Sequence, residues 1–89
     1  VVVPTAFTPN RNGANDVLRP VLYNIASVSY FKVFNRWGQL VFQTNTMNKG
    51  WDGTLNGVQQ PTETYTWILE CTDNSGNIIK KSGRSLLIR

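Results

Sequence analysis

The stretch that decides the fold is residues 30–42, which read Tyr-Phe-Lys-Val-Phe-Asn-Arg-Trp-Gly-Gln-Leu-Val-Phe. Two short runs of apolar, β-branched and aromatic residues flank the segment 35–39. Gly38 can adopt a positive φ at little energetic cost, which a tight chain reversal usually needs. We therefore predict a β-hairpin in which residues 30–35 pair with residues 39–43. A lone hairpin is only marginally stable in water, so we expect this one to form the middle of a larger sheet.

The clearest single strand is residues 64–72, because apolar and polar side chains alternate along it. Tyr65, Trp67, Leu69 and Cys71 fall on one face, and the other face is mostly polar. Alternation of period two with one polar face is typical of a half-buried antiparallel strand. We expect the four side chains on the first face to contribute to the core.

Shorter segments surround these two elements, and prolines interrupt two of them. In the first part of the chain we expect an edge strand at 1–7 around Pro4, a broken strand at 17–23 near Pro20, and a connector at 24–27 with room for a helical turn. In the last part we expect a turn at 73–77, followed by strands at 77–81 and 84–89. These two strands flank a bulge or bend at Ser82-Gly83. Six or seven short strands at close spacing, with no long segment of period 3.6, favour a β-sandwich over a small barrel.

Residues 44–56 are rich in turn-forming residues, yet they contain the segment Gly50-Trp51-Asp52-Gly53. The tryptophan is too large and apolar to lie unused in a solvated loop. We expect it to plug one end of the core, with its indole N–H bonded locally. Asp-Gly is a turn dipeptide, which predicts a reversal directly after the tryptophan.

The chain has 89 residues, which is enough for one domain with one modest core. It contains no apolar run near the roughly 20 residues of a membrane span. Its start also lacks the charged and apolar regions of a signal peptide. Because it begins Val1-Val2-Val3-Pro4 without a methionine, we expect it to be a piece of a longer protein.

The residue types present exclude several kinds of chemistry. The sequence has no histidine, which removes Ser–His and Cys–His nucleophile pairs and histidine-ligated zinc. Its single cysteine, Cys71, cannot form an intramolecular disulfide, and we expect a small buried apolar side chain rather than a reactive thiol. No two of the five carboxylates are adjacent in the sequence. We predict no enzymatic activity and no cofactor.

Positive charge gathers at the end of the chain. The net charge is +4, and four of the nine basic residues lie in the last ten: Lys80, Lys81, Arg84 and Arg89. Such a stretch can bind nucleic acid or an acidic partner, or it can be a solvated edge strand whose lysines prevent aggregation. Nucleic-acid binding is disfavoured, because the aromatic residues lie in strands and turns instead of among the basic residues.

Two further binding hypotheses concern the loops. Asn10, Asn12, Asn15 and Asp16 are oxygen donors around Gly13, which resembles a calcium loop, although only one of them is charged. The alternative is a loop pinned by Asx-type hydrogen bonds. Two tryptophans near turns, at positions 37 and 51, could also form a carbohydrate platform, but we favour packing against the ends of the sandwich.

Several motifs together resemble one known family. Phe7-Thr8-Pro9-Asn10 with Gly13-Ala14-Asn15-Asp16 is similar to the family's F-T-P-N-x-D-G-x-N-D opening. The other similar stretches are Asn35-Arg36-Trp37-Gly38 with Val41-Phe42, Gly50-Trp51-Asp52-Gly53, Pro61 with Tyr65-Thr66-Trp67, and Leu87-Ile88-Arg89. The chain thus resembles the gliding motility-associated C-terminal domain of Bacteroidota, the type B sorting domain of the type IX secretion system. Asn12 stands where the family usually has Asp, which makes a cation site there less favourable.

The resemblance implies an immunoglobulin-like antiparallel sandwich of about seven strands at the C-terminus of a secreted or surface protein. Such a domain is a non-catalytic address, recognised in its folded state by outer-membrane-associated secretion machinery. Its cargo lies on the N-terminal side, passes through the periplasm, and ends secreted or at the cell surface. The resemblance implies no membrane insertion. The alternative function is a cell-surface adhesion or carbohydrate-binding module.

A folded address needs polar groups that core packing does not require. We therefore expect partner binding by Arg36 in the hairpin turn and by the basic residues Lys80, Lys81, Arg84 and Arg89. We expect structural roles for the motif residues Asn35, Trp37, Gly38, Trp51, Asp52 and Gly53. Trp37 is expected to pack over the hairpin, and Arg36 to pair with a carboxylate such as Asp52.

Overall fold

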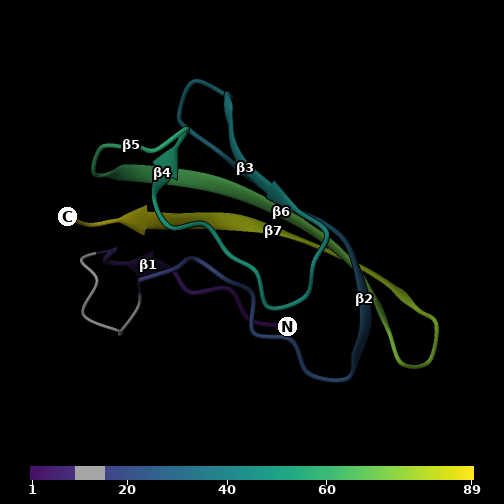
Figure 1. Ribbon diagram of the computed structural model, residues 1–89. Helices are drawn as coiled ribbons and strands as arrows, with labels where there is room; N and C mark the ends of the chain where they lie inside the picture. The colour runs from purple at the N-terminus through teal and green to yellow at the C-terminus, as the bar shows by residue number, and fades with distance from the viewer. Residues whose placement is uncertain (10–15) are drawn as a thin grey trace.

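The computed structural model describes residues 1–9 and 16–89, and it is built from β-strands (Figure 1). The seven strands are β1 (Ala6–Phe7), β2 (Ile25–Phe34), β3 (Leu40–Thr44), β4 (Thr54–Leu55), β5 (Val58–Gln59), β6 (Glu63–Asp73) and β7 (Ile78–Leu87). Five of them form one sheet in the order β1-β7-β6-β2-β3, and β4 and β5 form a separate two-stranded hairpin. In the described part of the chain, no helix is long and apolar enough to cross a membrane.

The predicted hairpin is confirmed, but its expected place in the middle of the sheet is wrong. β2 pairs with β3 in antiparallel register, and β3 is an edge strand. The central strand is β6, which pairs with β2 on one side and β7 on the other. Its length and its alternating faces allow it to hold a neighbour on each side. The sheet is also mixed rather than wholly antiparallel, because β1 runs parallel to β7.

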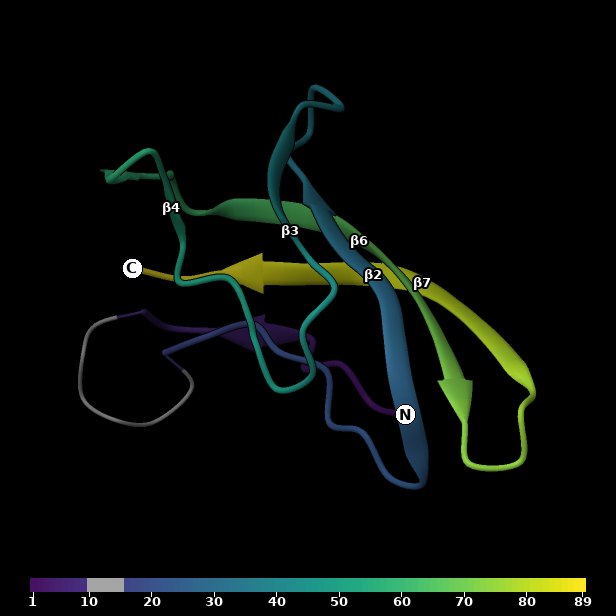
Figure 2. The same cartoon turned by 45° about the vertical axis from the view of Figure 1, so that its right-hand side comes forward.

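One face of the sheet is covered mainly by loops. In both views the N-terminal segment and the connector after β3 lie on the same side of β6 and β7 (Figures 1 and 2). Two isolated bridges, Val2↔Val21 and Leu18↔Trp51, join these segments. The strand expected at 17–23 is therefore reduced to single bridges around Pro20, which has no N–H to donate to a ladder. The connector expected at 24–27 forms no helical turn, because β2 begins at Ile25.

The core lies between the sheet and these loops. All four side chains that β6 was predicted to bury are buried. Trp51 plugs the core as expected: it is 1% exposed, and its indole N–H donates to the Thr54 carbonyl at 2.7 Å. Its ring lies between those of Phe7 and Tyr65, with centroid distances of 5.7 and 4.7 Å. Cys71 is buried, and this burial raises the pKa of its thiol.

The turn between β2 and β3 is fixed by its own side chains. Gly38 has a φ of +79°, as the sequence predicted. The Oδ1 atom of Asn35 accepts hydrogen bonds from the main-chain N–H groups of Trp37 and Gln39, at 2.9 and 3.0 Å. A register shift after Val33 follows, so that two consecutive residues of β3 both reach the core.

β7 is one continuous strand, so the predicted bulge or bend at Ser82-Gly83 is wrong. It pairs with β6 without a register shift from Glu63↔Leu87 to Thr72↔Ile78. Gly83 is needed for a different reason: a Cβ there would lie 2.7 Å from Cζ2 of Trp67 on the neighbouring strand. The glycine makes room for the indole, whose buried N–H has no hydrogen-bond partner among the described residues.

The turn between β6 and β7 lies at 73–77, as predicted. The Asp73 carboxylate accepts hydrogen bonds from the main-chain N–H groups of Asn77 and Ser75, at 2.8 and 2.9 Å. The hydrogen bonds from Asn77 are the main reason why the pKa of Asp73 is lowered. An ionised Asp73 therefore stabilises this turn at neutral pH.

Candidate partner-binding surface

The five predicted partner-binding residues are not gathered in one cluster. Arg36 follows β2 and Arg89 follows β7, and both lie near the start of β6, as the pairing of Phe34 with Thr66 and of Leu87 with Glu63 requires. Lys80 and Lys81 lie in the half of β7 next to the 73–77 turn. The tertiary structure therefore divides the predicted site between the two ends of the sheet.

Arg36 pairs with a carboxylate, as expected, but the partner is Glu63 and not Asp52. Its Nε lies 3.7 Å from Oε2 of Glu63, because the end of β2 lies beside the beginning of β6. Its guanidinium also lies 4.8 Å from the centroid of the Trp37 ring. Asp52 instead accepts hydrogen bonds from the main-chain N–H and the hydroxyl of Thr54.

Trp37 does not pack over the hairpin, which corrects another expectation. Its side chain is 77% exposed at the tip of the turn, where Gly38 and Asn35 hold the main chain. Large exposed aromatic side chains are enriched in binding surfaces. Trp37 and the guanidinium stacked on it thus form a solvent-facing pair at one end of the sheet.

Arg89 is engaged inside the domain. Its Nε donates to the Gln60 carbonyl and its Nη2 to the Gly53 carbonyl, both at 2.7 Å. Its main-chain N–H donates to Oγ1 of Thr62 at 3.1 Å. These bonds connect the end of β7 to the β4–β5 hairpin, so this side chain has a structural role that the sequence did not reveal.

The basic residues of β7 lie on both faces of the sheet. Lys81 is opposite Leu69 and therefore shares the face of the core, although its side chain is exposed. Lys80 is opposite Glu70, and the two side chains form an ion pair of 3.6 Å. Arg84 is opposite Thr66 on the same side as Lys80. We call this side, which faces away from the core, the outer face.

The outer face contains residues that sequence reasoning missed. The cross-strand register places Lys32 and Gln43 of β2 and β3 in one row with Ile68 of β6. Tyr30 lies in the next row, opposite Glu70. The signal was present, because alternation along residues 30–34 puts Tyr30, Lys32 and Phe34 on the face opposite to Phe31 and Val33. It was obscured because both faces of the hairpin carry aromatic side chains.

The proposed calcium site lies mostly outside the described residues. Asn10, Asn12 and Asn15 fall in the undescribed segment, and Asp16 is the first residue after it. Within residues 1–9 and 16–89, no three acidic or cysteine side chains come together as a metal site would require. Both interpretations of this loop, the favoured one pinned by Asx-type hydrogen bonds and the calcium hypothesis, therefore stay untested.

Comparison with known protein families matches residues 1–84 to the family described as CHU_C Type IX secretion signal domain. The chain belongs to this family. A search of curated proteins finds no significant match. As a CHU_C domain, the protein is a non-catalytic module that targets its cargo for type IX secretion, which implies export across the outer membrane and interaction with the secretion machinery.

The motif residues of the CHU_C domain mainly build its fold. Asn35 and Gly38 form the hairpin turn, and Trp51 fills the core. Asp52 fixes the next reversal, where Gly53 has a φ of +85°. Trp37 is the exception, because its exposed ring is not needed by the core.

Proposed function

We propose that this CHU_C domain is the C-terminal address of a larger protein, and that outer-membrane-associated machinery recognises it in the folded state. The observation that carries the proposal is the family match over nearly the whole chain. A folded address needs a fixed surface, and a continuous five-stranded sheet supplies one. The cargo then lies on the N-terminal side, crosses the periplasm in transit, and ends secreted or at the cell surface.

The finer fold we infer is an immunoglobulin-like sandwich whose second layer is reduced. Its support is Tyr65 near the start of β6, whose hydroxyl donates to the Pro61 carbonyl at 2.8 Å. A tyrosine bonded in this way to the main chain a few residues upstream is a feature of immunoglobulin-like domains. The bridges Val2↔Val21 and Leu18↔Trp51 join the N-terminal segment and the connector after β3, which run along one side of β6 and β7, where a second sheet would lie (Figure 2).

The proposed contact surface is the outer face with the adjoining hairpin turn. Lys80 and Arg84 are exposed on this face, and Arg36 in the turn is exposed while paired with Glu63. Lys81 stands on the same strand but points to the other face, so it would contribute only from the edge of the contact. Arg89 would contribute mainly by holding the end of β7 in place.

The experiment that tests the function is a fusion. Residues 1–89 are attached to the C-terminus of a periplasmic reporter and expressed in a host with type IX secretion. We expect the reporter in the medium or on the cell surface, and we expect it in the periplasm when the machinery is deleted. The proposal fails if the reporter stays in the periplasm while a known sorting domain exports the same reporter.

The alternative function, a cell-surface adhesion or carbohydrate-binding module, has one observation in its favour. Trp37 presents a ring that is 77% exposed, and exposed aromatic rings can stack on sugars. Titration of the domain with soluble oligosaccharides, read by Trp fluorescence, tests this function. A saturable change in fluorescence that Trp37→Ala abolishes would support carbohydrate binding, and no change in fluorescence would exclude it.

A further inference from the structure

The two edges of the five-stranded sheet are protected to different degrees. At one edge, β1 has two residues and lies between Pro4 and Pro9. At the other edge, β3 has five residues, with no proline and no charged side chain. Edges without such protection favour the addition of another strand.

The outer main-chain groups of β3 are available for pairing. Among the described residues, β2 is the only segment that forms main-chain hydrogen bonds with β3. The β4–β5 hairpin comes near β3 but pairs only within itself. Alternate N–H and C=O groups of an edge strand point away from the sheet and can bond a further chain.

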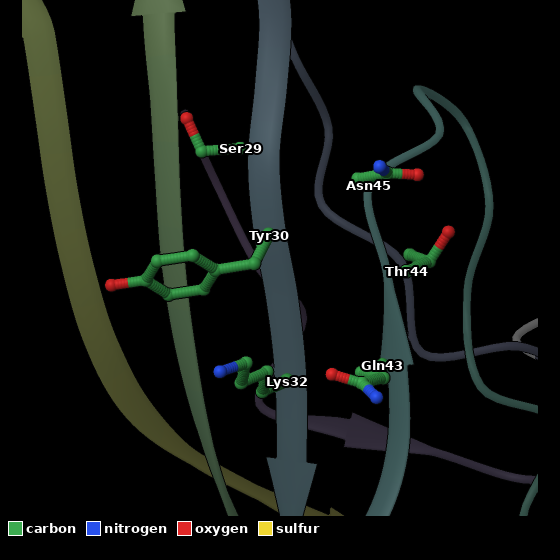
Figure 3. Close-up of a pocket in the computed structure, with 6 residues that line it drawn as sticks. All are labelled: Ser29, Tyr30, Lys32, Gln43, Thr44 and Asn45. Atoms are coloured by element: carbon green, nitrogen blue, oxygen red, sulfur yellow. The ribbon is translucent and has the colours of Figure 1, made fainter.

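A polar groove of about 460 Å³ lies beside this edge (Figure 3). Its lining side chains are all polar and can form hydrogen bonds, and none is acidic: Ser29, Tyr30, Lys32, Gln43, Thr44 and Asn45. In Figure 3, Tyr30 and Lys32 extend from β2 on the side away from β3, and Gln43 extends from β3 toward Lys32. The groove and the open edge therefore adjoin each other.

The charged side chains of the hairpin itself have one sign, and the nearby Glu70, opposite Tyr30 on β6, is paired with Lys80. The β2–β3 hairpin, residues 25–44, contains Lys32 and Arg36 and no carboxylate. Arg36 is paired with Glu63, whereas Lys32 forms no ion pair with any described residue. The Lys32 ammonium lies 4.9 Å from the centroid of the Tyr30 ring. It is thus a cation held in place beside the groove without a protein carboxylate.

We propose that β3 accepts an extended acidic segment of a partner protein, which adds as a strand and places a carboxylate in the groove at Lys32. Main-chain hydrogen bonds supply affinity in this mode of recognition, and side-chain pockets supply specificity. An acidic side chain is favoured because the groove contains a cation and no anion. The inference rests on the proposed function, since it names the chemistry of the partner that receives the domain.

Binding of synthetic peptides to the 89-residue domain tests this inference. The probe is a capped peptide that alternates glutamate and valine and is long enough to span β3. We expect saturable binding by fluorescence anisotropy, weakened by added salt because an exposed ion pair is screened. A peptide with lysine in place of glutamate should bind at least about fivefold more weakly. Methylation of alternate main-chain nitrogens of the glutamate peptide should abolish its binding, because it removes the strand-pairing donors.

Two matched variants locate the contact. Lys32→Glu should weaken binding about fivefold or more, whereas Arg19→Glu, which changes the net charge equally at an exposed position outside the β2–β3 hairpin, should leave it unchanged. Equal binding of the lysine peptide, equal loss in both variants, or retained binding of the methylated peptide would overturn the proposal. So would pairing of two copies of the domain through β3 in sedimentation, or displacement of the peptide by an oligosaccharide.

The peptide measurements are independent of export. If the fusion exports its reporter but the peptide does not bind, the strand-addition proposal fails and the targeting function stands. If the peptide binds as described but no reporter is exported, the proposed function fails instead. The methylated peptide is tested on the unmodified domain, so this result does not depend on whether a variant folds.

Discussion

At the scale of single residues, the contact between Gly83 and Trp67 shows how a missing side chain specifies the packing of a large one. The indole of Trp67 occupies the space above β7 where a Cβ on Gly83 would lie. Phe31 packs against the other side of the indole, with ring centroids 6.3 Å apart. The indole is therefore confined between two strands and cannot move to accommodate a larger neighbour.

We predict that Gly83→Ala destabilises the domain by roughly 1 to 3 kcal/mol, the range for overpacking a core. The added methyl group would overlap the indole at 2.7 Å. The measurement is the free energy of unfolding in urea. Ser82→Ala is the control, because this exposed neighbour faces away from Trp67, and it should change the free energy by no more than about 0.5 kcal/mol. Equal effects of the two substitutions would contradict the packing argument.

Tyr65 leads to a prediction about alkaline pH. Burial is the main cause that raises its pKa to about 12, from the usual value of 10.0, and Glu63 adds to the effect. The folded state therefore favours the neutral phenol. The resulting contribution of Tyr65 to the free energy of unfolding is fully present below pH 10 and is lost as the pH rises toward 12. It is on the order of 2 kcal/mol.

The test compares the free energy of unfolding of the unmodified domain and of Tyr65→Phe at several pH values. At pH 9 the unmodified domain should be the more stable, because it keeps the hydrogen bond to the Pro61 carbonyl. Above pH 10 the difference should shrink, since only the unmodified domain can ionise at this position. A difference that stays constant up to pH 12 would show that the phenol does not titrate in this way.

At the scale of elements, the end of β7 is held by the last residue of the chain. Arg89 bridges the carbonyls of Gly53 and Gln60, on the two sides of the β4–β5 hairpin. A guanidinium can do this because its donors point in several fixed directions, whereas a lysine ammonium is a single point of charge. The small hairpin therefore depends on β7, although no main-chain ladder joins the two.

We predict that Arg89→Ala lowers the free energy of unfolding by about 1 to 2 kcal/mol, the scale of a charge-assisted hydrogen bond at a partly exposed site. Amide hydrogen exchange should also accelerate at Thr54–Leu55 and Val58–Gln59. Arg89→Lys should recover little of the loss. Lys81→Ala, an exposed basic residue of the same strand, is the stability control and should have almost no effect. Unchanged hydrogen exchange in the hairpin would show that the Arg89 hydrogen bonds do not hold the β4–β5 hairpin in place.

At the scale of the whole molecule, the five-stranded sheet separates two faces of different composition. One face carries the core and its covering loops. The outer face carries Lys32, Lys80 and Arg84, with Glu70 as the one acidic side chain that the strand pairing places among them. A net positive surface attracts acidic molecules, which is consistent with the acidic partner proposed above.

We predict that reversing the charge at Lys80 and Lys81 lowers export of a reporter fusion without unfolding the domain. The Tm should change by no more than about 4 °C, since exposed substitutions change stability by about 0.5 kcal/mol. Because the two side chains point to opposite faces, the single variants separate the surfaces, and Lys80→Glu should reduce export more than Lys81→Glu. If the double variant is exported at the level of the unmodified domain, neither residue has a role in export.

The sequence by itself determined the features that depend on neighbouring residues. Asn35 and Gly38 specify the hairpin turn, and alternation along residues 64–72 specifies the buried face of β6. The burial of Trp51 and Cys71 was also predictable, because large or apolar side chains seek the core. Only the tertiary structure decided which residues meet from distant parts of the chain. The hydroxyl of Ser85 bonds the carbonyl of Pro4, 81 positions away, beside the parallel pairing of β1 and β7.

The same limit applies to the candidate site. Residue type suggested Arg36 and the basic residues of β7 as candidates for partner binding. It could not show that Arg36 forms an ion pair with Glu63 or that the Arg89 side chain donates to main-chain carbonyls. It also could not show that Lys32 lies beside an open edge strand. Turn chemistry and periodicity act over a few residues and can be read locally. Strand order, register and the availability of a charge depend on the simultaneous packing of the whole chain, which a local pattern does not encode.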